Sequence, residues 1–162
     1  MSTMRSGIGW DSHRLEAGRP LILGGVRIEH PDGLGLAGHS DADVLTHAVI
    51  DALLGAAGLD DIGTHFPDTD ERWRGADSIA LLQASAALVR GAGLELVNID
   101  ATVLIELPKL GARKHEMRDR IAAACGIAHT QVNIKATTGE GMGFVGRGEG
   151  IAALAVAMLS GA

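Results

Sequence analysis

The chain has 162 residues, of which 46% are hydrophobic, 2% are aromatic and 23 are glycine. This length fits one compact domain, whose core must consist mainly of Ala, Leu, Val and Ile. The formal net charge of −6 excludes a broad surface for nucleic acid. The longest apolar run, 151–159, is about half of what a membrane-spanning helix needs. We therefore expect a cytoplasmic protein with no membrane or nucleic-acid partner, and the lone Cys125 excludes an internal disulfide.

The first third of the chain predicts a strand, a hairpin and a helix. Residues 6–13 are typical of a strand, and 21–30 place apolar residues on both sides of the tight-turn dipeptide Gly24-Gly25, which indicates a hairpin. Apolar residues at helical spacing follow the capping signal Ser40–Asp43. We expect this helix to end near Gly55–Gly58.

The remaining elements alternate between helices and strands. Helical spacing predicts helices over 76–90 and 110–126, whereas 94–106, 131–137 and 151–160 favour strands. The residues expected to face the core are Val97, Ile99, Ala101, Val103 and Ile105, then Ile121, Ala124 and Cys125, and finally Val132, Ile134 and Ala136. The stretches 33–40 and 139–150 are expected to be loops because they are rich in glycine, and 59–73 is expected to be one because it contains Pro67 and lacks periodicity.

The order of these elements predicts the α+β class. The four long strands are expected to form a mixed four-stranded sheet, covered on one face by helices, with a small N-terminal hairpin beside it. No linker, repeat or low-complexity tract interrupts the chain, so we expect a single domain over residues 1–162.

Two groups of polar residues have the composition of a metal site. Asp11 and His13 lie two apart on a predicted strand and therefore share a face, but taken alone this pair favours a hydrogen-bonded or surface pair over two metal ligands. His39, Asp43, His47 and Asp51 step by four through the first predicted helix, although Asp43 also suits a helix cap. Asp11, His13 and one histidine of this row would form a His₂Asp set, which catalytic Zn²⁺ accepts with one position left open.

A third group lies around the glycine-rich stretch 139–150. Its backbone N–H groups, the hydroxyls of Thr137 and Thr138 and the guanidinium of Arg147 suit an anion. Glu140 would repel a phosphate unless a hard cation such as Mg²⁺ lies between them. A mobile loop with solvated charges is the alternative. Taken alone, Asp68 favours a turn and Lys109 a surface position.

Seven segments in order carry a resemblance to a known family. They are GWDSHRL, LAGHSDADVLTHAVIDALLGA, DIGTHFPDTD, GADS, ELPKL, NIKATT and GFVGRGEGIAA, and the match that contains them runs from about Gly7 to the end of the chain. Together they closely resemble the 2-C-methyl-D-erythritol 2,4-cyclodiphosphate synthases. Such enzymes convert 4-diphosphocytidyl-2-C-methyl-D-erythritol 2-phosphate to the cyclic diphosphate and release CMP, in the non-mevalonate route to isoprenoid precursors.

The resemblance implies a role for each matching residue. It implies a Zn²⁺ ion on Asp11, His13 and His47, and Mg²⁺ or Mn²⁺ on Glu140. The residues implied to stabilise the transition state are His39 and Thr138. Those implied to hold the methylerythritol phosphate are Ser40, Phe66 and Asp68, and those implied to hold the cytidine are Asp61, Gly63, Pro108, Lys109 and Thr137.

The resemblance also implies an assembly. Similar proteins are homotrimers with sheets packed around a threefold axis and active sites between subunits. Phe144, Arg147 and Glu149 match a motif that lines a central cavity, where some members bind an isoprenoid diphosphate. Two positions depart from the family pattern, Gly139 where Thr is common and Asp60 where Gly is common. A zinc-dependent nucleotide-diphosphate hydrolase and a non-catalytic trimeric isoprenoid-binding protein are the alternative functions.

Overall fold

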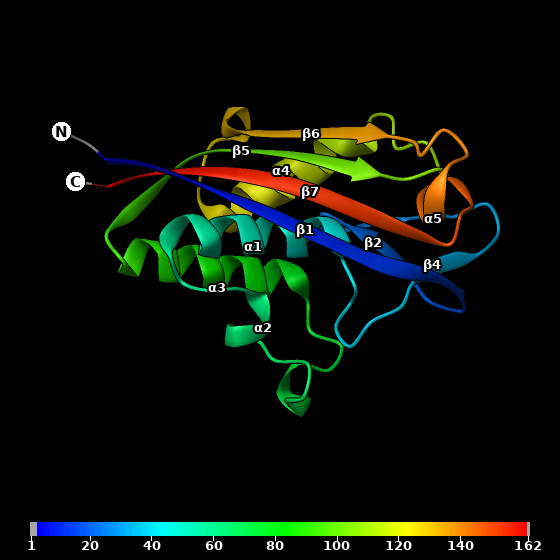
Figure 1. Cartoon of the computed structure of the whole chain (residues 1–162), viewed down its shortest axis with the longest axis horizontal. Helices are drawn as coiled ribbons and strands as arrows, with labels where there is room; N and C mark the ends of the chain where they lie inside the picture. The colour runs from blue at the N-terminus through cyan, green and yellow to red at the C-terminus, as the bar shows by residue number, and fades with distance from the viewer. Residues whose placement is uncertain (1–2, 162) are drawn as a thin grey trace.

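The computed structural model describes residues 3–161, which contain one five-stranded sheet (Figure 1). The strands lie in the order β4, β1, β7, β5, β6. Their bounds are β1 Thr3–Ala17, β4 Leu34–Leu36, β5 Leu94–Leu104, β6 Val132–Thr137 and β7 Gly150–Gly161. Strand β6 is parallel to β5, whereas all other neighbours are antiparallel. The predicted mixed α+β arrangement is therefore confirmed.

The predicted number of four strands is wrong, because part of the 33–40 stretch forms a fifth. Strand β4 pairs with the end of β1, where Leu36 lies opposite Leu15. Three residues are too few to show the alternation that identifies a strand in sequence. The strand forms because β1 continues to Ala17, past its predicted end at residue 13, and so presents an edge to pair with.

The predicted hairpin is confirmed as a small separate sheet. Strands β2 (Leu21–Leu23) and β3 (Val26–Ile28) are antiparallel neighbours. Gly24 and Gly25 connect them with φ values of +57° and +72°, a conformation that costs glycine little and other residues more.

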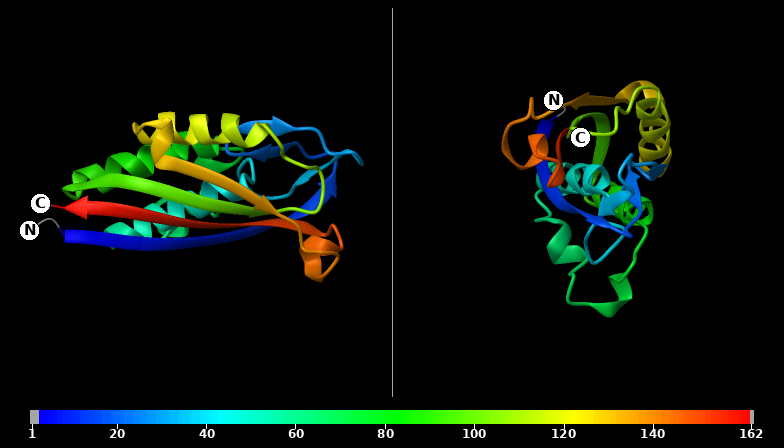
Figure 2. Two further views of the ribbon diagram at one scale, coloured as in Figure 1. Left: turned by 90° about the horizontal axis from the view of Figure 1, so that it is seen from above. Right: turned by 90° about the vertical axis from the view of Figure 1, so that its right-hand side faces the viewer.

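Three long helices cover one face of the large sheet (Figure 2). They are α1 (Val44–Ala57), α3 (Ser78–Gly91) and α4 (Arg113–Cys125). The shorter helical turns are α2 (Ile62–His65), η1 (Glu71–Trp73), η2 (His129–Gln131) and α5 (Gly143–Gly146). Three of these turns lie in stretches expected to be loops. No helix within residues 3–161 is both long and apolar enough to cross a membrane.

Three of the predicted core positions are wrong. Val97 is only half-buried because a bulge between Leu96 and Asn98 shifts the buried side of β5 by one residue. Ala136 is exposed near the end of β6, and Ala124 is half-buried on α4. Alternation alone misplaces Val97, because this apolar residue fits the same odd-numbered series as Ile99 and Ala101, although it lies in the bulge.

Strand β1 and helix α1 approach each other closely through glycine. Gly7 and Gly9 face the helix, and a Cβ atom at either position would overlap the α1 backbone at Ala52 or Ala48. This close approach places the first turns of α1 directly over the middle of β1. The polar residues of both elements are brought together there.

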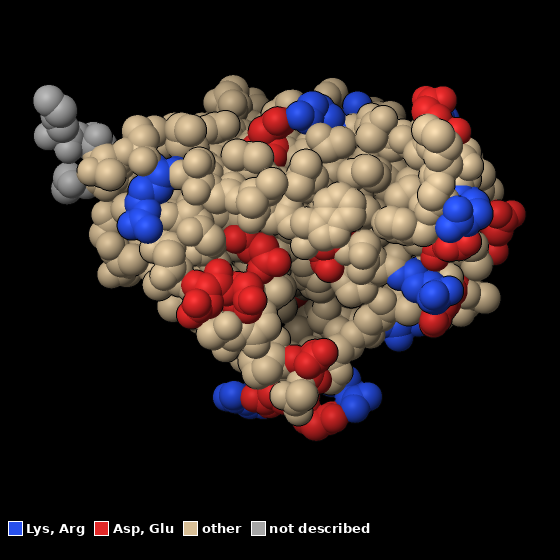
Figure 3. All heavy atoms as spheres, in the orientation of Figure 1, with Lys and Arg blue, Asp and Glu red and all other residues tan. Residues whose placement is uncertain are grey.

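The second face of the sheet is left open by this chain. Ile8 and Trp10 of β1 are 67% and 52% exposed, and Val156 of β7, directly opposite Ile8, is 42% exposed. Figure 3 views the molecule from this side and shows few charged side chains over the middle of the sheet. The open face is therefore largely apolar.

Candidate metal centre and active site

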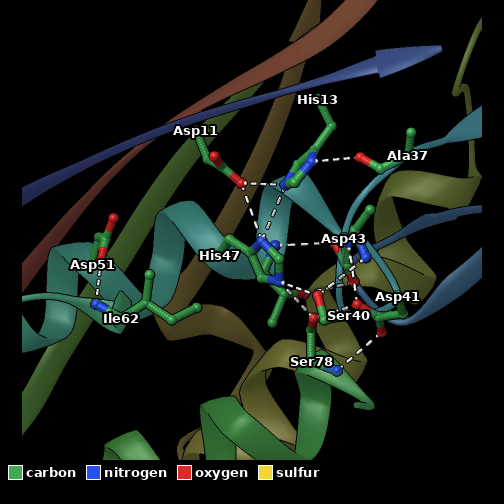
Figure 4. A network of polar contacts seen from close by, with 12 residues as sticks. Asp11, His13, Ala37, Ser40, Asp41, Asp43, His47, Asp51, Ile62 and Ser78 are labelled. Atoms are coloured by element: carbon green, nitrogen blue, oxygen red, sulfur yellow. Dashed lines mark hydrogen bonds and ion pairs between the residues drawn. The ribbon is translucent and has the colours of Figure 1, made fainter. Parts of the chain in front are cut away.

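Three side chains from two elements meet where α1 crosses the sheet (Figure 4). Asp11 and His13 come from alternate positions of β1, and His47 comes from the start of α1. Oδ2 of Asp11 lies 2.9 Å from Nε2 of His13 and 3.1 Å from Nδ1 of His47. The two ring nitrogens are 3.4 Å apart. These three atoms surround one point and could hold a metal ion.

The donor atoms fit a small divalent cation. Two imidazole nitrogens and one carboxylate oxygen form a ligand set found in catalytic zinc sites, whose tetrahedral ligands lie about 3.3 Å apart. Nδ1–H of His13 donates a hydrogen bond of 2.8 Å to the Ala37 carbonyl, which leaves its Nε2 lone pair free for a metal. Of the two histidines that the sequence left open, the structure brings His47 to the cluster, and not His39.

The Asp11 carboxylate and the His13 imidazole stabilise each other's charged forms. Burial alone would raise the pKa of the Asp11 carboxyl, but hydrogen bonds and favourable charge from His13 and His47 outweigh it and lower that pKa to about 2. Burial alone would lower the pKa of His13, but its contact with Asp11 outweighs burial and raises it. Asp11 is therefore held in the ionised form that a cation requires.

The row of polar residues through α1 does not form one face. Asp43 is the helix N-cap, in place of Ser40, and is fully buried. Its carboxylate accepts hydrogen bonds from the N–H groups of Gly24, Gly25 and Thr46 and from the Thr46 hydroxyl, so it fastens the hairpin to the helix. His39 precedes the helix and lies near the Asp70 carbonyl. Asp51 accepts a hydrogen bond from Ile62 N–H, which holds α2 against α1.

A cavity of about 430 Å³ opens beside the metal centre. Its lining includes the three proposed ligands together with five of the other predicted site residues, namely His39, Ser40, Gly63, Phe66 and Asp68. Asp61 lies nearby as the exposed N-cap of α2. The structure thus brings together at one cavity residues from β1, α1 and the 59–73 segment.

Sequence reasoning missed four apolar residues that also line this cavity, namely Ile62, Pro67, Trp73 and Leu81. Trp73 packs edge-on against Phe66, with ring centroids 5.1 Å apart. Isolated apolar residues carry no chemical signal in a sequence. The scarcity of aromatics could have indicated this pair, because the chain has only two Phe and two Trp and places one of each within eight residues.

The other predicted residues lie in a separate place. Pro108, Lys109, Thr137 and Thr138 line a hollow of about 90 Å³ near the ends of β5 and β6. The Thr138 hydroxyl accepts a hydrogen bond from Glu140 N–H, and its oxygen lies 3.3 Å from Oε1 of Glu140. In one chain, therefore, the predicted site residues fall into two groups, one at the metal centre and one at this hollow.

The residues matched to a central cavity lie in α5 and in the turn between α5 and β7. Arg147 and Glu149 form an ion pair of 2.7 Å. Phe144 and Glu149 line a hollow of about 170 Å³ beside Ser12 and Arg14 of β1, whereas Arg147 lines a different one of about 260 Å³. The single chain does not bring all three residues to one hollow.

Both departures from the family pattern have local structural consequences. A Cβ atom at Gly139 would overlap the backbone of Gly146 and Met142, so this loop closes tightly on α5. Asp60 has a φ of +62°, a left-handed conformation that glycine adopts at less cost. The observed fold therefore requires glycine at position 139, whereas the backbone at Asp60 is strained.

Fold and site together define an α+β domain with a candidate metal centre at the wall of a cavity, the arrangement of a metal-dependent enzyme. The chain belongs to the YgbB family, whose model matches residues 4–160. The resemblance inferred from the motifs is thereby confirmed.

Known relatives include both single and fused enzymes. The chain is 60% identical over 156 residues to the 2-C-methyl-D-erythritol 2,4-cyclodiphosphate synthase of Bordetella avium, covering 96% of this chain and 95% of the relative. It is also 60% identical over 153 residues to the bifunctional enzyme IspD/IspF of an Anaeromyxobacter species, covering 94% of this chain but only 39% of that relative. A solved 2C-methyl-D-erythritol-2,4-cyclodiphosphate synthase in a CDP-bound form matches with a TM-score of 0.86 and 39% identity, covering 96% of this chain and 99% of that one.

Proposed function

We propose that this chain converts 4-diphosphocytidyl-2-C-methyl-D-erythritol 2-phosphate to 2-C-methyl-D-erythritol 2,4-cyclodiphosphate and releases CMP. The observation that carries the proposal is the cluster of Asp11, His13 and His47 at the wall of the cavity, in a chain 60% identical to a named synthase over 95% of that synthase's length. The reaction class is an intramolecular phosphoryl transfer by a phosphorus–oxygen lyase.

Two cations belong to this proposal. Asp11, His13 and His47 would hold Zn²⁺, and Glu140 would hold Mg²⁺ or Mn²⁺. When bound, such ions polarise phosphate oxygens and neutralise their charge. The fixed Nδ1–H of His13 and the ionised Asp11 support the zinc assignment. The exposed Glu140 carboxylate, held beside Thr138, supports the second.

The chain's own residues have to position the substrate, because the nucleophile belongs to the substrate. An oxygen of its 2-phosphate forms a new bond to the β-phosphorus, and the bond from that phosphorus to the oxygen bridging to the α-phosphate breaks. That bridging oxygen leaves with CMP. Ser40 and Phe66 would hold the methylerythritol phosphate, Asp68 would accept hydrogen bonds from its hydroxyls, and His39 and Thr138 would stabilise the transition state.

The cytidine would be held by residues from both groups. Gly63 lines the cavity beside the metal centre and Asp61 is the N-cap of the same short helix α2, whereas Pro108, Lys109 and Thr137 lie at the other hollow. This separation within one chain supports an active site completed by a neighbouring copy. The solved CDP-bound synthase supports a cytidine nucleotide as the ligand.

A homotrimer would supply that neighbouring copy. The largely apolar open face of the sheet, with exposed Ile8, Trp10 and Val156, supports packing of sheets around a threefold axis. Phe144, Arg147 and Glu149 would then line a central cavity that could take an isoprenoid diphosphate. We also propose that residues 1–162 form one domain and that the protein is located in the cytoplasm.

Product analysis tests the proposed function. The purified chain, given the cytidyl substrate with zinc and magnesium, should release CMP together with the cyclic diphosphate, and a chelator should abolish both products. His47→Ala should lose zinc and CMP release while keeping its fold. Recovery of an open-chain phosphate in place of the cyclic product would favour the zinc-dependent hydrolase. If the chain releases neither product but binds an isoprenoid diphosphate, the result would favour the non-catalytic binding protein.

A further inference from the structure

A line of buried polar groups stands behind the candidate metal centre (Figure 4). On the side of His47 that faces away from Asp11, Nε2 lies 2.8 Å from the hydroxyl oxygen of Ser78. That hydroxyl donates a short hydrogen bond to Oδ1 of Asp41. Ser78 is fully buried and His47 is 8% exposed, so water does not compete for the contact between them, whereas Asp41 is half-buried.

The Asp41 carboxylate fixes the direction of each hydrogen bond in this line. A carboxylate only accepts hydrogen bonds. Oδ2 of Asp41 accepts one from Ser78 N–H at 2.9 Å, and Oδ1 accepts one from Asp43 N–H at 3.2 Å as well as the bond from the Ser78 hydroxyl. Because Ser78 has a single hydroxyl proton and gives it to Asp41, its oxygen can only accept from His47.

We propose that Asp41 and Ser78 are positioning residues that hold His47 with its proton on Nε2. Nδ1 of His47, which lies 3.1 Å from Oδ2 of Asp11 in the metal-free chain, is then the nitrogen that would present its lone pair to a bound metal. The inference deepens the proposed function and rests on it, because it concerns the same centre. The Ser40 hydroxyl also lies near Nε2 of His47, but at 3.2 Å it is the more distant acceptor.

Ser78→Ala removes the nearer acceptor without adding bulk. Nothing then favours the Nε2–H form of His47 as strongly, so we expect the zinc affinity of the full chain to fall about tenfold to a hundredfold. Competition with a chromophoric zinc chelator measures this affinity directly and does not depend on turnover. Ser78→Thr keeps the hydroxyl and should restore an affinity close to that of the unaltered chain.

Asp41→Asn tests the direction of the bonds. An amide in either orientation points an N–H group at another N–H, that of Ser78 or that of Asp43. In the second orientation it also donates to the Ser78 oxygen, whose own proton then turns toward His47 and favours the wrong tautomer. We expect a loss of zinc affinity comparable to that of Ser78→Ala.

Two variants on α3 provide matched controls. Ser85→Ala removes another fully buried hydroxyl of the same helix, one that donates to the Leu81 carbonyl. Asp77→Asn alters the N-cap of that helix without touching Asp41 or His47. Both should leave zinc affinity unchanged even where thermal stability falls. A structural role for Ser78 alone would instead make its variant resemble these controls.

An NMR spectrum of the zinc-loaded chain reports the tautomer of His47 directly. The Nε2 proton of His47 is buried and hydrogen-bonded, so it should give a slowly exchanging imidazole resonance that correlates with Nε2. This resonance should be lost or shifted in Ser78→Ala and Asp41→Asn, and it should persist in Ser85→Ala. Should Ser78→Ala not fold, Ser78→Thr and Asp41→Asn carry the comparison. Unchanged affinity, or an unchanged resonance, in folded Ser78→Ala or Asp41→Asn would overturn the inference. An unaltered chain that binds no zinc would overturn the proposed function, and the inference with it.

Discussion

At the scale of single residues, the candidate centre depends on how Asp11 and His13 share charge. The carboxylate lies 2.9 Å from the imidazole, and each side chain is about a quarter exposed or less, so the pair is only partly screened by water. The same contact that lowers the pKa of Asp11 raises that of His13. In the absence of metal the two form an ion pair, and a metal would take the place of the proton on His13.

This ion pair predicts a pH dependence of stability in chelator-treated protein. The pKa of Asp11 falls from 3.8 to about 2 on folding, so its contribution is complete above 3.8 and is lost as the pH falls through about 2. The pKa of His13 rises above 6.5, so its contribution is complete below 6.5 and is lost as the pH rises through the folded value. Asp11→Asn should therefore be less stable than the unaltered chain at about pH 5.5, and the difference should shrink by about pH 9.

Urea unfolding in the presence of a chelator measures both differences. Asp100→Asn is a suitable control, because Asp100 pairs with Lys135 at 2.7 Å on the surface and a lysine stays charged at both pH values. Its effect should be the same at both. An Asp11→Asn deficit that does not change with pH would contradict the assignment of the ion pair.

At the scale of elements, glycine decides how close helix and sheet can lie. The candidate ligands come from β1 and α1, and their separation depends on the missing Cβ atoms of Gly7 and Gly9. His47 immediately precedes Ala48, whose carbonyl would overlap a side chain at position 9. The metal centre is therefore coupled to a packing contact at the next position of the same helical turn, which also faces β1.

Gly9→Ala should disturb both the fold and the centre. Helix α1 would have to move off the sheet, so we expect a loss of stability of about 3 kcal/mol or more and a marked loss of zinc affinity. Chemical denaturation and chelator competition measure the two effects. Gly91→Ala, at the end of α3 with open space around the added methyl group, is the control and should be neutral. Normal zinc binding by Gly9→Ala would show that the approach of α1 does not set the ligand geometry.

At the scale of the whole molecule, a single chain leaves two features incomplete. Its sheet has a largely apolar open face, and its predicted site residues lie at two separate hollows. Packing copies of the chain around a threefold axis would resolve both, because it would cover the apolar face and bring the hollow of one copy to the metal centre of the next.

Ile8→Glu tests the packing of the open face. The change places a charge opposite Val156 in the middle of that face, where burial between copies would leave the carboxylate unpaired. We expect light scattering to give three times the 16.7 kDa chain mass for the unaltered protein and a single chain mass for the variant. Gln83→Glu, on the exposed side of α3, should leave the mass unchanged. An Ile8→Glu variant with the mass of the unaltered protein would exclude this face as the interface.

Mixing inactive variants tests whether each site takes residues from two chains. His47→Ala alters the group at the metal centre and Glu140→Gln alters the group at the other hollow. If each site lies between two chains of a randomly mixed trimer, each chain supplies its unaltered group with a chance of about one half. About a quarter of the sites should then be intact, which gives about a quarter of full activity. CMP release after joint refolding measures this recovery. His47→Ala mixed with His13→Ala, both in the same group, should stay inactive. If His47→Ala and Glu140→Gln chains form mixed trimers but recover no CMP release, the whole site would lie within one copy.

Local patterns in the sequence determined the secondary structure and the residue types of the site. Apolar periodicity located the long helices and strands, Gly24-Gly25 located the hairpin, and the spacing of Asp11 and His13 placed two ligands on one face. These features depend on neighbours within a few positions, which a sequence displays directly. The seven motifs added the family, because their combined length leaves little room for coincidence.

Only the tertiary structure decided which of those residues meet. It chose His47 over His39, turned Asp43 into a buried cap, added β4 to the edge of β1 and placed a bulge in β5. It also set Ser78 behind His47, although 31 positions separate them in the chain. Each of these outcomes depends on contacts between distant segments, and a contact of that kind is fixed by how helices pack on the sheet. Periodicity along one segment carries no record of it.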